Sequence, residues 1–508
     1  MENLLLSLQA ILQWDTLLLM FIGVLAGIIF GSIPGFTITM AVALTLPFSF
    51  GLEPLQGIAL MMGVWIGGAS GGLISACLLG IPGTPSAVAT TFDGYPMTRK
   101  GEPGRALAIG LWSSFFGAII GGVILVLAAP MLAGWALRFG PWEFFALMVF
   151  GLSAIASLGQ GNLLKGIAAG LIGMFVGTIG LDPVLGTERF TFGTVEMLGG
   201  FDFLPILIGI FAFSQLLSEV QNKNRQTFDF DKKVSLSYPI GKTIKDMFSS
   251  IVNVVRSSVI GTIVGALPGA GSSIANLLSY DIAKKSSKHP EKFGKGTKDG
   301  VIAAETANNS SEGGALIPTL ALGIPGSAVT AMMMGALLIH GIQPGPFFLT
   351  TQPVLANGIF LSFFISAFFM LLIQTFGIRA FLRINDVPLH YLLPIVITLC
   401  ALGSFAINNR VFDIWVLLLF GVIGYLLKKT DFSLAAFVLG VILGPMTEEN
   451  LRRALETNPD PMLFITRPIS GALLFLTVAS IGYALYSNHR YNKKVKAEQL
   501  PEDRSLKV

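Results

Sequence analysis

The sequence predicts an all-α polytopic membrane protein built from two inverted repeats, each with a re-entrant helical hairpin and a helix broken at a Gly-Pro motif. The first observation is composition: 53% of the 508 residues are hydrophobic and only 12% are charged, and the mean hydropathy is +0.73. Several apolar runs of about 18 or more residues are long enough to cross a bilayer. The other two observations are a duplicated motif set and an uneven distribution of loop charge.

One set of Gly-Pro motifs occurs in both halves of the chain. Gly31-Ser-Ile-Pro-Gly-Phe-Thr37 recurs as 265–271, and Gly80-Ile-Pro-Gly-Thr84 recurs as 323–327. Pro and Gly interrupt helices, and a break inside hydrocarbon is tolerated only where protein or water satisfies the freed backbone groups. Matching breaks in two halves indicate a binding site at a repeat interface. The alternative is close helix packing through small residues, which needs Gly but not duplicated Pro-Gly breaks.

Lys and Arg gather in the linker 221–249, the linker 284–299 and the C-terminal tail, which we therefore place in the cytoplasm. The segment 250–283 joins two cytoplasmic linkers, so it is expected to be a hairpin that enters and leaves on one side, turning at Pro268-Gly269. The run 16–50 has the same form, with its break at Pro34-Gly35. Its base, 51–56, has no Lys or Arg and is placed outside, so the two hairpins face opposite sides.

These expectations divide the chain into a first membrane repeat (1–220), a cytoplasmic linker (221–249), a second repeat (250–466), and a final span with a basic cytoplasmic tail (467–508). The stretches 57–97 and 300–340 each exceed the length of one span. Each is either one broken span with an extension or a span followed by a second dip. Single crossings are expected near 106–133, 143–158, 163–181, 203–220, 355–378, 390–407, 411–427, 432–446 and 467–487.

The second repeat is polar where the first is apolar. Residues 300–314 read GVIAAETANNSSEGG, whereas 57–71 read GIALMMGVWIGGASG. At helical spacing, Glu305, Asn308, Asn309 and Glu312 share one face. Polar groups within a span are costly and normally face a cavity or one another, so we assign Glu305, Asn308, Ser311 and Glu312 to cation binding. The alternative is a water-filled cytoplasmic vestibule followed by a membrane half-helix.

The breaks themselves offer a second kind of site. The N-terminus of a half-helix presents unpaired N–H groups that suit a carboxylate, and carbonyl oxygens at a helix C-terminus suit Na⁺. For the hydroxyl side chains, helix capping is the alternative to ligand binding. The candidate substrate-binding residues are Gly35, Thr37, Gly83, Thr84, Ser86, Gly269, Gly271, Ser272, Ser273, Asn309, Ser310, Gly326 and Ser327.

None of these candidates is Lys or Arg, so helix termini and co-bound cations must balance the charge of a polyanionic ligand. Sodium coupling follows, with proton coupling through Glu305 or Glu312 as the alternative. No GxxxxGK[ST] loop is present, so the chain has no ATPase of its own. The four histidines lack metal-ligand spacing; we expect no transition metal, no organic cofactor, no nucleic-acid partner and no enzymatic activity. Cys77 and Cys400 lie in apolar runs and are interpreted as buried hydrophobes.

Several long ungapped segments resemble the large membrane subunit (TctA) of the tripartite tricarboxylate transporters. They are GSIPG at 31–35, GIPGTPSAVATTFDGYPM at 80–97, GLDP at 180–183, GALPGAGSSIANLLSYDIAKK at 265–285, AAETANNSSEGGALIPTLALGIPGS at 303–327 and EENLRRAL at 448–455.

The resemblance implies a multi-pass subunit of a secondary transporter in the bacterial inner membrane. Its partners would be a small four-span membrane subunit and a periplasmic substrate-binding protein, and its substrate citrate or a related carboxylate, with Na⁺. Analogy with other hairpin-bearing carboxylate transporters adds an elevator motion. The competing interpretations are a proton-coupled transporter of another organic anion, and a channel or scaffold subunit. Loops 51–56, 182–202 and 341–353 are the candidate outer contacts for the binding protein.

Overall fold

The computed structural model describes residues 2–158, 163–182, 185–221, 240–384 and 389–498. Most of the predicted linker 221–249 and the end of the basic tail therefore lie outside the described residues. The helices form two compact units, residues 1–137 with 202–425, and residues 138–201 with 426–508. Each unit draws on both predicted repeats. The division into repeats, linker and tail stays a prediction.

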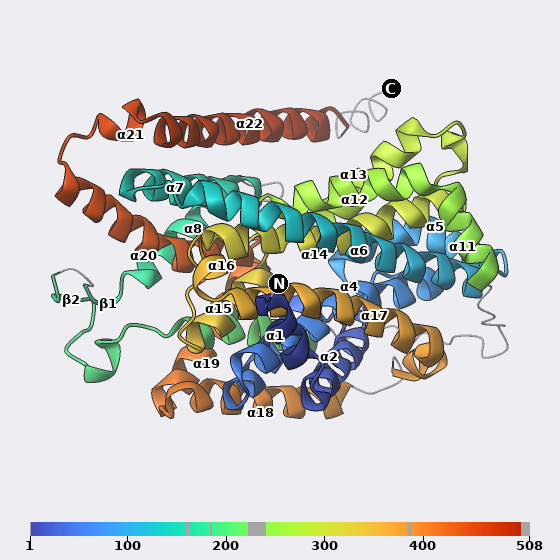
Figure 1. The fold of residues 1–508 in the computed structure, drawn as a ribbon, viewed down its shortest axis with the longest axis horizontal. Coiled ribbons are helices and arrows are strands. Elements are labelled where there is room, and N and C mark those ends of the chain that lie inside the picture. The colour runs from blue at the N-terminus through green and yellow to red at the C-terminus, as the bar shows by residue number, and fades with distance from the viewer. Residues whose placement is uncertain (1, 159–162, 183–184, 222–239, 385–388, 499–508) are drawn as a thin grey trace, which may run out of the picture. The chain divides into compact units, whose positions relative to one another are not determined.

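Unit 1 begins with the first hairpin and the first broken helix. Figure 1 shows α1 beside α17, with which it packs. The elements are α1 (Glu2–Ile11), α2 (Trp14–Ser32), α3 (Ile38–Thr45), η1 (Leu46–Gly51), α4 (Pro54–Leu79), η2 (Pro85–Ala87), α5 (Val88–Arg99) and α6 (Pro103–Ala136).

The second part of unit 1 repeats this order of hairpin and broken helix. In Figure 1, α12 and α13 run side by side as the two arms of the second hairpin. The elements are α9 (Phe203–Leu207), the π-helical η4 (Ile208–Phe213), α10 (Ser214–Gln221), α11 (Ile240–Ser249), α12 (Ile251–Ala266), α13 (Gly271–Ser286), η5 (Pro290–Lys292), α14 (Lys298–Leu322), α15 (Ala328–Ile339), α16 (Phe348–Thr351), α17 (Pro353–Ile384), α18 (Leu389–Asn408) and α19 (Val411–Lys429), whose last residues belong to unit 2.

The backbone takes the same conformations at the duplicated breaks. Helices α4 and α14 both end at a glycine in the left-handed region, Gly80 at φ 72° and Gly323 at φ 71°. Glycine adopts this conformation without the steric cost of a Cβ. Helices α2 and α12 both end in an extended residue, Ile33 and Leu267. The motifs therefore terminate helices in the same way in both halves.

Helix α2 packs on α4 as α12 packs on α14, through aligned glycines. A Cβ on Gly27 would collide with the Val64 carbonyl oxygen, and a Cβ on Gly261 with the carbonyl oxygen of the aligned Ala307. Glycine at a crossing lets two backbones approach closely. The same collisions occur for Gly31 on Gly68, Gly265 on Ser311, Gly71 on Ile28 and Gly314 on Thr262. The halves therefore share helix pairs; their opposite orientation in a membrane stays a prediction.

Among the described residues, seven helices are long and apolar enough to cross a membrane, and an eighth if the bent pair α11–α12 forms one span. Helix α14 matches α4 in length but is polar. The stretches 57–97 and 300–340 each form a long helix, a break and a short helix (α4–α5 and α14–α15). The chain is therefore a multi-pass membrane protein. The seven are Trp14–Ser32, Pro54–Leu79, Pro103–Ala136, Phe203–Gln221, Pro353–Gly377, Val411–Lys429 and Leu434–Thr457.

Unit 2 is a helical bundle in which α20 packs against α7 and α8. Glycines again permit the contact: a Cβ on Gly173 of α8 would collide with the carbonyl oxygen of Phe437 in α20. The elements are α7 (Pro141–Leu158), α8 (Leu163–Gly177), β1 (Gly180–Leu181), β2 (Glu188–Arg189), η3 (Val195–Met197), α20 (Leu434–Thr457), α21 (Leu463–Thr466) and α22 (Pro468–Glu498).

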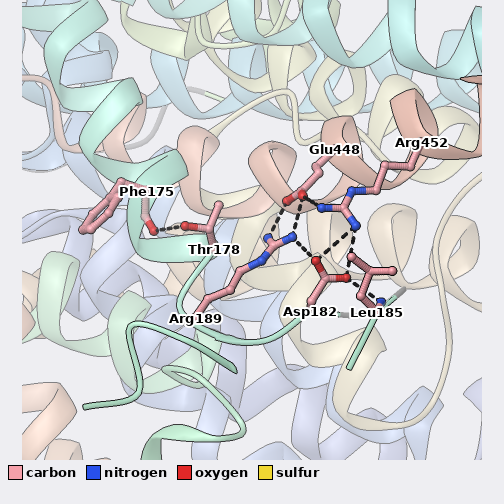
Figure 2. Close-up of polar contacts among 7 residues, drawn as sticks. All are labelled: Phe175, Thr178, Asp182, Leu185, Arg189, Glu448 and Arg452. Carbon is pink, nitrogen blue, oxygen red and sulfur yellow. Dashed lines mark hydrogen bonds and ion pairs between the residues drawn. The ribbon is translucent and has the colours of Figure 1, made fainter. Parts of the chain in front are cut away.

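A network of four charges ties the short antiparallel strands β1 and β2 to α20 (Figure 2). Arg189 binds both oxygens of Glu448, at 2.8 and 2.9 Å, and also contacts Asp182. Arg452 pairs with Glu448 at 2.7 Å and with Asp182 at 3.1 Å. Each arginine thus pairs with both carboxylates, and the four charges neutralise one another.

Candidate functional site

The candidate site is built on α14, in which every residue from Gly300 to Ala321 is buried. The Asp93 carboxylate of α5 accepts hydrogen bonds from the backbone N–H groups of Gly296 (2.7 Å) and Thr297 (2.9 Å), just before this helix begins. A negative charge at a helix N-terminus is favourable. The Tyr280 hydroxyl of α13 donates to the same carboxylate at 2.8 Å. The second hairpin, α5 and α14 are therefore held together at this end.

Glu305 is held from two sides by hydroxyl groups. Thr90 Oγ1 of α5 donates to Glu305 Oε1 at 2.5 Å, and Ser114 Oγ of α6 donates to Oε2 at 2.9 Å. The side chain is fully buried. Both carboxylate oxygens thus have donors from the protein, which orients Glu305 and leaves it less free to bind a ligand than its neighbours.

The next turns of α14 present acceptor atoms that the protein does not use. Asn308 Nδ2 donates to the Ala69 carbonyl oxygen (2.9 Å), and Asn309 Nδ2 donates to the Glu305 carbonyl oxygen (3.3 Å). Within the described residues, Asn308 Oδ1, Asn309 Oδ1 and Glu312 Oε1 are buried without a hydrogen-bond partner. A buried acceptor left unpaired costs roughly 1–3 kcal/mol. The three oxygens are therefore available to a ligand on the face that the sequence predicted.

Glu312 connects this face to the second hairpin and to the first half of the chain. The side chains of Ser272, in the first turn of α13, and of Trp65, in α4, lie beside its carboxyl group. Trp65 is fully buried and occupies the position in α4 that aligns with Asn308 in α14. An apolar ring in one half thus stands where the other half has an amide.

The duplicated breaks lie against one another. The Gly269 N–H donates to the Gly326 carbonyl oxygen at 2.9 Å, so the second hairpin tip meets the second broken helix. In the first half, Gly83 packs against the Gly31 carbonyl. Elements of the two halves also contact each other: α13 contacts η2 and α5, and α3 contacts α15. Asn276 of α13 accepts a hydrogen bond from the Ala89 N–H at 2.8 Å.

Several predicted hydroxyls serve as helix caps. Thr37 Oγ1 accepts from the Met40 N–H (3.1 Å) at the start of α3, and Ser327 Oγ accepts from the Thr330 N–H (3.2 Å) at the start of α15. Capping is the alternative role that the sequence left open for them.

The other predicted hydroxyls bond locally. Thr84 and Ser86 are buried and hydrogen-bond each other at 3.0 Å. Ser310 Oγ donates within α14 to the Ala307 carbonyl and packs against Gly261 of α12. Ser311 Oγ donates to the Asn308 carbonyl oxygen at 2.6 Å. Ser310 therefore lies at the helix crossing, away from the Asn309 face.

The remaining predicted positions belong to the two hairpin tips. Gly35 and Gly271 have φ of 96° and 64°, and Gly271 opens α13 next to the half-buried Ser272 and Ser273. The Gly35 carbonyl accepts a hydrogen bond from Gln215 of α10. The first tip is therefore held by α10.

Sequence reasoning missed five residues that shape the site: Thr90, Asp93, Ser114, Asn276 and Tyr280. Asp93 lies in the motif 80–97, but nothing in its spacing points to Tyr280 or to the start of α14. Their partners are between 187 and 215 residues away along the chain. Only the packing of α5, α6 and α13 around α14 reveals these contacts.

The arrangement can bind a hard cation through amide and carboxylate oxygens, and an anion through the N–H groups at the breaks. Among the described residues, no cluster of three or more His, Cys, Asp or Glu side chains could hold a metal ion. In the part of the chain that the structure describes, Glu312 offers one carboxylate oxygen that has no hydrogen-bond partner.

Comparison with known proteins identifies the family of the chain. A family model described as the tripartite tricarboxylate transporter TctA family matches residues 17–439. An uncharacterized 52.8 kDa protein in the TAR-I ttuC' 3'region of Agrobacterium vitis is 36% identical over 502 residues, 98% of this chain and 99% of the relative. An uncharacterized protein in the TAR-II ttuC' 3'region of the same organism is 36% identical over 231 residues, 45% of this chain and 96% of the relative. No solved structure matches the chain. The chain therefore belongs to the tripartite tricarboxylate transporter TctA family, and it is a transporter subunit, not an enzyme.

Proposed function

We propose that this chain is the large membrane subunit of a binding-protein-dependent secondary transporter that imports citrate or a related di- or tricarboxylate together with Na⁺. The observation that carries the proposal is a row of buried acceptor oxygens on α14, at Asn308, Asn309 and Glu312, which have no hydrogen-bond partner within the described part of the chain. Buried acceptors in a membrane protein favour a ligand that is positive or donates hydrogen bonds.

Sodium is the coupling ion that these oxygens suit best. Na⁺ is a hard cation that prefers amide, carboxylate and carbonyl oxygens, as Ca²⁺ and Mg²⁺ do. Asn308 and Glu312 are the proposed ligands, with Glu305 as a positioning group because Thr90 and Ser114 already occupy its oxygens. Proton coupling would instead use Glu312, whose carboxyl has one unpaired oxygen.

The carboxylate is expected at the breaks, beside the cation. Helices α3, α13 and α15 begin just after them, and their first N–H groups and positive dipole ends favour an anion. Asn309 and Ser272 are the proposed side-chain contacts. An elevator movement would carry the hairpins and broken helices together, because Gly269 is bonded to Gly326.

The proposed partners are a small four-span membrane subunit and a periplasmic substrate-binding protein, and the proposed location is the bacterial inner membrane. The membership of the chain in the TctA family supports both. The binding protein would determine much of the substrate specificity, so this chain alone does not define which carboxylate is carried.

The test is uptake of labelled citrate by vesicles that contain this chain, its small partner and the binding protein, with and without a sodium gradient. Saturable, sodium-driven uptake that needs the binding protein is the expected result. Uptake driven by a proton gradient alone would show that H⁺ and not Na⁺ is the coupling ion. Uptake of a different carboxylate would show that citrate is not the substrate. Flux without saturation would indicate a channel, and copurification without any flux would indicate a scaffold.

A further inference from the structure

Helices α11 and α12 meet at a bend of 76°, visible in Figure 1 as a change in direction between the two light-green helices. We call residues 240–259 the elbow. Its outer face is apolar and exposed, although α11 and α12 also have an inner face of buried residues such as Met247 and Val254. The exposed apolar side chains are Ile240 (42%), Phe248 (66%), Ile251 (47%), Val252 (75%), Val255 (46%) and Val259 (40%).

Three cations accompany this apolar face. Lys242 and Lys245 are exposed on α11. Arg256 lies on α12, four residues after Val252 and three before Val259, and therefore within the same helical stripe. Arg256 is half-buried: within the described residues its buried Nε has no hydrogen-bond partner, and one guanidinium N–H donates to Asn253 at 2.6 Å. Arg256 is six residues beyond the bend, about 9 Å along the helix, which is within reach of a surface at the level of α11.

The inner side of the elbow is fixed to the rest of unit 1. Asp246 pairs with Arg105 of α6 at 3.1 Å and with Lys298 of α14 at 3.0 Å. Ser250 Oγ donates to the Asp299 carboxylate at 2.7 Å, and Asn253 Nδ2 to the Asp299 carbonyl oxygen at 2.9 Å. In these bonds the carboxylates of Asp246 and Asp299 are paired on the inner side. The same bonds also hold the bend in one geometry and turn the apolar and basic face outward.

We propose that the outer face of the elbow binds an anionic phospholipid of the bilayer. Helix α11 lies along the membrane surface with Phe248 inserted between acyl chains, and α12 enters the bilayer at the bend. Lys242, Lys245 and Arg256 contact the negatively charged headgroup. A basic helix with one apolar face is the expected form of an interfacial segment, and the three cations supply the charge complementarity that selects an anionic over a zwitterionic lipid.

The predicted cytoplasmic location of the elbow agrees with this proposal. The sequence places the linkers before and after 250–283 in the cytoplasm, where Lys and Arg accumulate, and the cytoplasmic leaflet carries the anionic lipids. Because Lys298 and Asp299 open α14, the lipid-bound elbow is bonded directly to the helix that carries the candidate site. The proposal does not depend on the transported substrate.

The first test titrates the purified full chain in neutral detergent with phosphatidylglycerol or phosphatidylcholine, counting bound lipids by native mass spectrometry. The chain is expected to retain phosphatidylglycerol preferentially. The variant K242Q/K245Q/R256Q is expected to lose about fivefold in that preference for each charge removed. The control K284Q/K288Q/K292Q removes the same charge from exposed lysines of the neighbouring linker and is expected to retain the preference.

Equal retention of both lipids by the unaltered chain, or the same loss in both triple variants, would overturn the proposal. A second measurement does not rely on charge. A nitroxide at Phe248→Cys, in vesicles containing phosphatidylglycerol, is expected to be more accessible to oxygen than to a water-soluble nickel complex. A nitroxide at Lys288→Cys is expected to show the reverse. Preferential nickel access at position 248 would place α11 in water and overturn the proposal.

Discussion

At the scale of single residues, two glutamates on one face of α14 have different environments. Glu305 receives hydrogen bonds on both oxygens from Thr90 and Ser114. Glu312 lies two turns further on, and its Oε1 has no hydrogen-bond partner among the described residues. The same residue type therefore positions helices at one place and offers a ligand atom at the other.

This difference predicts different effects of mutation. Glu305→Ala is expected to lower the melting temperature of the purified protein, because it removes two hydrogen bonds to a carboxylate, each contributing about 1.5–3 kcal/mol. Glu312→Gln is expected to leave the melting temperature nearly unchanged and to reduce sodium-driven uptake strongly. Thermal unfolding in detergent and vesicle uptake measure the two effects. An unchanged melting temperature for Glu305→Ala would contradict a positioning role.

Asn309 offers a second prediction at this scale. Asn309→Ala removes a buried, unpaired acceptor and is expected to reduce uptake by about tenfold or more, the magnitude of one hydrogen bond to a charged ligand. The amount of protein in the membrane should not change. Asn450→Ala is the matched control, since its amide donates to the Met446 carbonyl of its own helix. Normal uptake by Asn309→Ala would remove this residue from the site.

At the scale of elements, the strands β1 and β2 depend on charge for their attachment to α20 (Figure 2). Asp182 is almost fully buried beneath Arg189 and Arg452. Breaking a buried ion pair by removing one partner costs about 3–5 kcal/mol, because the other charge is left uncompensated. The pair between Arg453 and Glu449 is more exposed and contributes little.

We therefore expect Asp182→Asn to release the segment between β1 and α9, which should be cut faster by added protease in vesicles that expose this side. Arg453→Gln should leave the rate of cleavage unchanged. Equal cleavage of Asp182→Asn and the unaltered chain would show that the network does not hold the loop.

The duplicated helix crossings support another prediction about elements. Gly27→Val and Gly261→Val are expected to destabilise the fold to a similar degree, because in each a side chain would meet the backbone of the paired helix. Overpacking costs about 1–3 kcal/mol, and more where backbone cannot move. Gly134→Ala, in α6, is the control, since a Cβ there meets no neighbouring atom. A melting temperature lowered in only one of the two valine variants would argue against equivalent crossings.

At the scale of the whole molecule, each compact unit is assembled from distant parts of the chain. Unit 1 contains both hairpins and both broken helices, and unit 2 contains α7 and α8 from the first half and α20–α22 from the second. Both halves of the chain therefore contribute helices to each unit. This division does not by itself orient the halves in the membrane.

Orientation can be tested with engineered cysteines, because Cys77 and Cys400 are both buried. Lys288→Cys is expected to react with a membrane-impermeant maleimide only from the cytoplasmic side. Thr350→Cys, in the predicted outer loop 341–353, is expected to react only from the periplasmic side. Labelling of both positions from the same side would contradict the topology predicted for the second repeat.

The sequence by itself determined the class of the protein, its family and the places where helices break, because hydropathy, long motifs and Gly-Pro dipeptides are local signals. The resemblance to TctA is confirmed across residues 17–439, and both breaks of the broken helices occur at the predicted glycines. The polar face of α14 could also be predicted, since a period of 3.6 residues places 305, 308, 309 and 312 together.

Only the tertiary structure decided which of those polar groups remain free. The sequence pattern alone does not distinguish Glu305 from Glu312 as a ligand. In the structure, Thr90 and Ser114 donate hydrogen bonds to Glu305. Asp93 becomes an anchor for α14 because α5 packs beside it. These contacts join residues about 200 positions apart. A hydrogen bond depends on the final positions of two side chains, and no local pattern in the chain encodes the distance between them.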